Sequence, residues 1–105
     1  MAENVEAAVD DFNAQMAQAI NDDTLPEIHF NGFIITIAQG DVLILLKRHG
    51  KNITKLNASY TVAKTLAVKL AGLITNLEQR TGNTVMTNDE IEAAFREVRE
   101  DSYKP

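Results

Sequence analysis

The segment from Ile28 to Leu56 constrains the fold most, because turn signals cut it into short runs of β-forming residues. The runs are rich in Ile, Val, Leu, Phe and Thr, and they are separated by Asn31-Gly32, Gln39-Gly40-Asp41 and His49-Gly50-Lys51-Asn52. Such turns between apolar runs are typical of β-hairpins. The segment is therefore predicted to form an antiparallel meander of about three strands.

The expected strands differ in how much cover they need. Residues 33–37 alternate along a first strand, whereas residues 42–46 are apolar on both faces and predict a central strand that is covered from both sides. Residues 53–56 alternate again, and Lys55 would point to solvent, as expected of an edge strand. Whether residues 28–30 form a separate short strand is left open by the pattern.

Three helices are predicted around the meander. An amphipathic helix is expected over residues 1–20, where Val5, Val9, Phe12, Met16 and Ile20 recur at helical spacing. A long helix is expected over residues 59–81, with Ser59 as N-cap, Gly82 at its end and a leucine-rich face that packs on the sheet. A short C-terminal helix over residues 88–100 follows a capping box at residues 87–90.

These elements predict an α+β fold, in which a small antiparallel meander packs against the long helix, with residues 1–105 as a single domain. The chain is 45% apolar and 24% charged, which is typical of a globular domain, and it has no cysteine for a disulfide framework. The start carries acids where a signal peptide needs bases, and no apolar run is long enough to span a membrane. We therefore expect a cytoplasmic protein with no membrane partner.

The stretch from Asn31 to about Val85 resembles a small uncharacterised bacterial domain family of unknown function. The likeness rests on an Asn that opens one strand, an acid that opens the next, a Ser-x-x-x-Ala-Lys helix start and a Leu-Glu before a Gly; these are Asn31, Asp41, Ser59–Lys64, Leu77-Glu78 and Gly82. Tyr60 stands where that family usually has Pro. The resemblance implies antiparallel strands backed by a long helix, pairing as a dimer and a bacterial or phage source, but no activity.

We find no residue pattern for catalysis or for a cofactor. His29 and His49 are about twenty residues apart, and no Cys is present to complete a zinc site. Neither Ser59 nor Ser102 lies in a Gly-x-Ser-x-Gly elbow, and the glycines are scattered singly rather than grouped as in a phosphate-binding loop. The chain is therefore predicted not to be an enzyme, and neither a cofactor nor a metal site is predicted.

Charge is segregated along the chain. Residues 1–26 hold six acids and no Lys or Arg, whereas residues 27–87 hold seven bases against three acids. Four bases and an Asn gather on one expected hairpin, as Lys47, Arg48, Lys51, Asn52 and Lys55. These residues are candidates for binding nucleic acid or another anion. A solubilising loop or a docking place for the acidic helix is the favoured explanation, because a chain with a net charge of −5 would repel nucleic acid.

The leading functional prediction is a non-enzymatic interaction or assembly domain that forms a homodimer, because the apolar stripes exceed what one small sheet can cover. The residues predicted at the dimer interface are Val5, Val9, Phe12, Met16, Val68 and Gly72. The alternative is a nucleic-acid-binding or anion-binding accessory protein that acts through residues 47–55. Whether the N-terminal helix docks in cis, docks in trans or stays free is left open.

Overall fold

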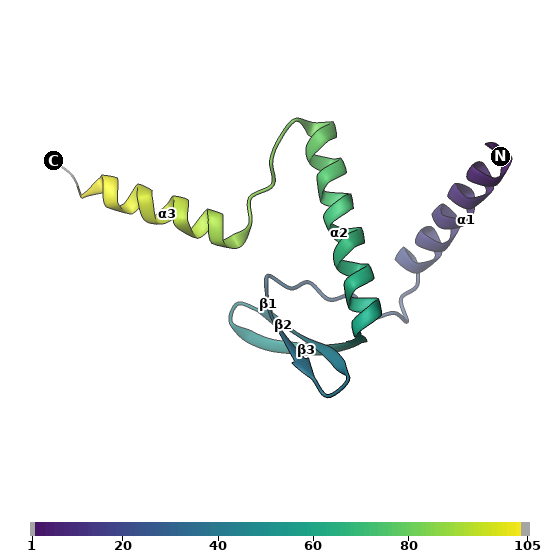
Figure 1. The fold of residues 1–105 in the computed structure, drawn as a ribbon, viewed down its shortest axis with the longest axis horizontal. Helices are drawn as coiled ribbons and strands as arrows, with labels where there is room; N and C mark the ends of the chain where they lie inside the picture. Colours follow the sequence, from purple (N-terminus) through teal and green to yellow (C-terminus); the bar gives the residue numbers. More distant parts are fainter. Residues whose placement is uncertain (1, 104–105) are drawn as a thin grey trace. The chain divides into compact units, whose positions relative to one another are not determined.

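A computed structural model describes residues 2–103 of the chain as three helices and three strands (Figure 1). In chain order the elements are α1 (Ala2–Ile20), β1 (Gly32–Ala38), β2 (Asp41–Arg48), β3 (Lys51–Ser59), α2 (Tyr60–Thr81) and α3 (Asn88–Ser102). The strands form one antiparallel sheet in the order β1-β2-β3. The predicted α+β fold with a three-stranded antiparallel sheet is confirmed.

Both hairpin loops are two residues long and use backbone with positive φ. Gly40 has φ 79° in the first loop, and His49 and Gly50 have φ 50° and 79° in the second. The second loop has positive φ at both positions, as a type I′ turn requires, and the twist of such a turn matches that of the flanking strands; in the first loop Gly40 alone has positive φ. His49 is the non-glycine residue of the described chain that adopts this left-handed backbone.

The sheet spans residues 32–59, whereas the meander is predicted over residues 28–56. Residues 28–30 do not form a strand; instead, the Asn31 N–H donates to the Lys47 carbonyl at 3.0 Å, just before β1 begins at Gly32. β3 runs on through Ser59, three residues beyond the expected end at Leu56. The open question about residues 28–30 is thus answered by a single backbone hydrogen bond rather than by a fourth strand.

Local capping sets the ends of α2 and α3. The Ser59 hydroxyl accepts the N–H of Val62 at 3.2 Å, and Gly82, with φ 71°, closes α2 by donating its N–H to the Glu78 carbonyl. Thr87 and Glu90 form the predicted capping box at the start of α3, which continues two residues past the expected residue 100. Since these signals lie within a few residues of each helix end, they are legible from sequence.

The described residues form two compact units, residues 2–34 with 45–55 and residues 35–44 with 56–103. Each unit takes part of the sheet; the first also contains α1, and the second contains α2 and α3. The expectation of one domain remains a prediction.

Very little of the described chain is buried. Leu46 in the central strand is 5% exposed and is the one buried hydrophobic residue, while its neighbours in β2 are half-buried. Neither α2 nor α3 has a buried residue. The leucine-rich face expected to pack on the sheet is exposed, at Leu66, Leu70, Leu73, Ile74 and Leu77. The structure therefore has well-defined elements whose apolar faces lack cover.

Candidate interaction surfaces

The basic hairpin, defined as Lys47, Arg48, Lys51, Asn52 and Lys55, lies at the turn between β2 and β3. Successive residues of a strand point to opposite faces of the sheet, so Lys47 and Arg48 are separated. The two-residue loop brings Arg48 opposite Lys51, and Lys55 follows four residues along the same strand. Three of the four bases therefore share one face, whereas Lys47 lies on the other face with Asn52.

The bases differ in their surroundings. The Arg48 Nε donates to the carbonyl of His29 at 2.9 Å, which ties this guanidinium to the segment before β1. Lys47 is half-buried, whereas Lys51 and Lys55 are exposed. Glu92 and Arg96 form an ion pair on α3, whereas none of the four bases of the basic hairpin forms an ion pair with a described residue. Its positive charge is consequently available to an outside anion.

Asn31 holds the tip of the basic hairpin in place. Its Oδ1 accepts the backbone N–H of His49 at 3.0 Å, and its Nδ2 lies 3.3 Å from the His49 Nδ1. The side chain thus anchors the residue with φ 50° that forms the turn. Sequence reasoning missed both Asn31 and His29 here, because they are 18 and 19 residues from their partners and carry no local signal of the contact.

The predicted interface residues of α1 form an exposed apolar stripe. Val5, Val9, Phe12 and Met16 have exposed fractions of 64%, 51%, 62% and 46%. An amphipathic stripe on a helix of this length is stable only when another surface covers it. In the described chain, however, no surface covers this stripe.

The other predicted interface residues lie on α2, opposite its leucine-rich face. Val68 is 63% exposed, and a Cβ added at Gly72 would meet no atom within 4 Å. Near them the Thr65 hydroxyl donates to the Thr61 carbonyl at 2.8 Å, so this polar group is satisfied within the helix. The side of α2 that carries Val68 and Gly72 thus has small side chains, and another helix can pack closely against it. It belongs to a different unit from the α1 stripe.

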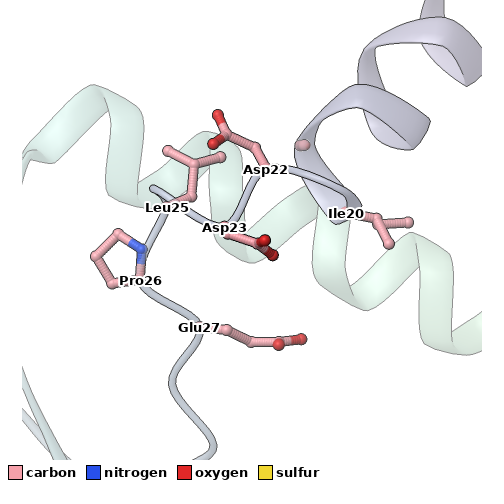
Figure 2. Close-up of a pocket in the computed structure, with 7 residues that line it drawn as sticks. Ile20, Asp22, Asp23, Leu25, Pro26 and Glu27 are labelled. Atoms are coloured by element: carbon pink, nitrogen blue, oxygen red, sulfur yellow. The ribbon is translucent and has the colours of Figure 1, made fainter.

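A hollow lined partly by carboxylates lies just after α1 and is shown in Figure 2. It has a volume of about 420 Å³ and is lined by Ala19, Ile20, Asp22, Asp23, Leu25, Pro26 and Glu27. Hydrogen bonds from the Thr24 hydroxyl and the Thr24 N–H hold the pKa of Asp22 below its ordinary value.

By accepting these hydrogen bonds from Thr24, the Asp22 carboxylate stabilises the turn that follows α1. Figure 2 shows its carboxylate and that of Asp23 pointing in different directions. In the described part of the chain no three His, Cys, Asp or Glu side chains are grouped closely enough to hold a metal ion.

None of the helices in residues 2–103 combines the length and the hydropathy needed to cross a membrane. Comparisons of the chain with family models, with curated proteins and with solved structures find no match.

Proposed function

We propose that this protein is a non-enzymatic assembly domain that functions as a homodimer, in which each copy covers apolar faces of the other. One observation carries the proposal: Leu46 is the single buried hydrophobic residue of the described chain, while apolar side chains on all three helices remain exposed. Burial of apolar surface is the main favourable term that offsets the conformational entropy lost on folding. A chain with so little burial needs a partner to stay folded.

Exposed apolar side chains occur within each of the two units taken by itself: α1 carries them in one unit, and α2 and α3 carry them in the other. An obligate homodimer interface is large and hydrophobic, and buries about 2,000–5,000 Å² counted over both partners. The proposed dimer therefore uses apolar faces from both units of each copy.

The two sides of α2 also favour pairing. One side carries the exposed leucines, of which Leu73 is 64% exposed, and the opposite side carries Val68 and Gly72. A helix with apolar or small side chains on both of its sides is typically packed between two layers of structure. A single three-stranded sheet can supply one layer, so the second layer is expected from another copy.

Further support comes from the absence of any residue pattern for catalysis and from the resemblance over residues 31–85, which implies a paired domain. The lack of cysteine agrees with a reducing compartment, and we place the protein in the cytoplasm.

Light scattering coupled to size-exclusion chromatography tests the proposal. At micromolar concentration the measured mass should be about twice 11.6 kDa. A monodisperse monomer that binds no hydrophobic dye would contradict the proposal, because its apolar faces would then be covered within one chain.

A second candidate function, binding of nucleic acid or another anion, is favoured by the shared face of Arg48, Lys51 and Lys55, where none of the three bases forms an ion pair with a described residue. Three duplex phosphates neutralised by these bases would give a log–log slope of affinity against salt of about −2.7. A titration with short duplex and single-stranded oligonucleotides checks this slope. No binding at low salt would exclude this function, and loss of the slope when the three bases are replaced by Gln would support it.

A further inference from the structure

The apolar stripe of α1 follows a seven-residue repeat. With Val9 and Met16 at position a, Val5, Phe12 and Ala19 fall at position d. Alternating spacings of three and four residues place these side chains along one seam, as in a coiled coil. The helix spans Ala2–Ile20, which is just over two and a half repeats. The seam therefore runs from Val5 to Ala19.

The charges of α1 are turned away from this seam. The helix contains no Lys or Arg, so two copies of it would repel if their acids met. Asp10 and Asp11 fall at positions b and c, on the outer side, and Glu6 is the one acid at a position flanking the seam among residues 5–20. The other flanking positions hold Ala8, Asn13, Gln15 and Ile20. This arrangement permits self-pairing, whereas docking on the basic hairpin would require acids beside the stripe.

The structure also shows a place for a partner side chain on the stripe. Val5, Ala8, Val9 and Phe12 line an apolar hollow on α1. These residues stand at i, i+3, i+4 and i+7, which is the diamond of four that receives one side chain of a facing helix in knobs-into-holes packing. In a parallel pair, equivalent residues lie side by side. The side chain placed to enter this hollow is therefore Val9 of the second copy.

We infer that α1 pairs in parallel with α1 of a second copy, with the Val9 side chain of each copy seated in the hollow of the other. The inference rests on the proposed homodimer and names one of its contacts. It explains how the acids of α1 stay solvated while its stripe becomes covered.

Cysteine cross-linking of the full chain tests the pairing, because the native sequence contains no cysteine. Val9→Cys should form a disulfide-linked dimer under mild oxidation, whereas Asp10→Cys, one residue away on the outer side, should remain unlinked. An a-position residue in a parallel pair meets its own equivalent, so the linkage requires no second variant.

A second measurement guards against a local effect of the cysteine. Phe12→Gln should raise the dimer dissociation constant at least tenfold, and Ala14→Gln on the outer side should leave it unchanged. Circular dichroism should report the same helix content for both variants.

The outcomes separate the pairing from the dimer itself. If the full chain forms a dimer but Val9→Cys does not cross-link, the parallel pairing is wrong and the proposed function stands. A disulfide that forms only in a mixture of Val5→Cys and Met16→Cys chains would overturn the parallel arrangement. A monomeric full chain would overturn both the pairing and the proposed function.

Discussion

The central strand β2 and the helix α2 differ in what the chain itself provides for them. β2 is flanked by a strand on each side and contains Leu46, the one hydrophobic residue that the described chain buries. α2 has a cap at each end, yet none of its residues is buried. The comparison teaches that local signals are sufficient to define an element, whereas covering its apolar face requires a surface supplied from elsewhere.

The largest expected effect is on the free energy of unfolding and concerns Leu46 in the central strand β2. Leu46→Ala should lower the free energy of unfolding by about 2–5 kcal/mol, because it removes packed atoms and leaves a cavity. Leu45→Ala, one residue away on the other face and only half-buried, should have a clearly smaller effect. Urea unfolding of both variants measures the difference. Equal losses would show that the two faces of β2 are equally covered.

The next largest effect concerns the exposed leucine-rich face of α2. In an uncovered helix, Leu73→Glu would change stability by no more than about 0.5 kcal/mol, as for most surface substitutions. In a dimer that covers this face, we expect Leu73→Glu to raise the dissociation constant at least about a hundredfold, since a charge would be buried without a partner. Lys69→Glu, at the boundary between the two sides of α2, is the control. Sedimentation equilibrium gives the dissociation constants of the two variants and distinguishes these cases. Equal dissociation constants would show that the leucine-rich face of α2 is not covered in the dimer.

A substitution at Gly72 is expected to have a smaller effect, and the sign of the change in stability shows whether a second copy packs against this residue. In an isolated helix, Gly72→Ala should stabilise by about 0.5–1 kcal/mol, and no neighbouring atom within the chain opposes the added methyl group. If a second copy approaches closely at this residue, the same change should instead weaken the dimer by about tenfold. Thermal unfolding at fixed concentration, with Lys69→Ala as the reference, gives the sign. A gain in stability would remove Gly72 from the interface.

The smallest effect concerns a helix end that requires no partner. Hydrogen bonds from the Thr87 N–H and the Thr87 hydroxyl hold the pKa of Glu90 below its ordinary value of 4.5. A carboxyl with a lowered folded pKa contributes stability above its unfolded pKa and loses that contribution as pH falls through the folded value.

Helix content should therefore decrease slightly in acid as the capping box weakens. Glu90→Gln should lack this component of the pH dependence. Far-ultraviolet circular dichroism from neutral to acid pH provides the measurement, and an unchanged acid profile in Glu90→Gln would mean that Glu90 is not its source.

Features encoded within a few residues were predictable from sequence. Ser59, Gly82 and the pair Thr87–Glu90 mark the helix ends because capping is local chemistry, and the glycines at 40 and 50 mark the hairpin loops because positive φ is cheap for glycine. The division of the basic hairpin between two faces also follows from strand alternation alone.

Features that depend on distant residues were not predictable. The bond from Arg48 to the His29 carbonyl and the contacts between Asn31 and His49 join segments that are far apart in sequence. Coverage of the apolar faces is also non-local: the leucines of α2 have helical periodicity whether or not anything packs on them. This is why the sequence predicted a packed face and the structure presents an exposed one.

The most direct test of the central claim is equilibrium unfolding in urea at two protein concentrations. If each copy covers the other, unfolding is coupled to dissociation, and a hundredfold increase in concentration should raise the apparent stability by about 2.7 kcal/mol. The transition midpoint should move to higher urea accordingly. A midpoint that is independent of concentration, in a cooperative transition of a chain with the monomer mass, would contradict the claim that a second copy covers these apolar faces.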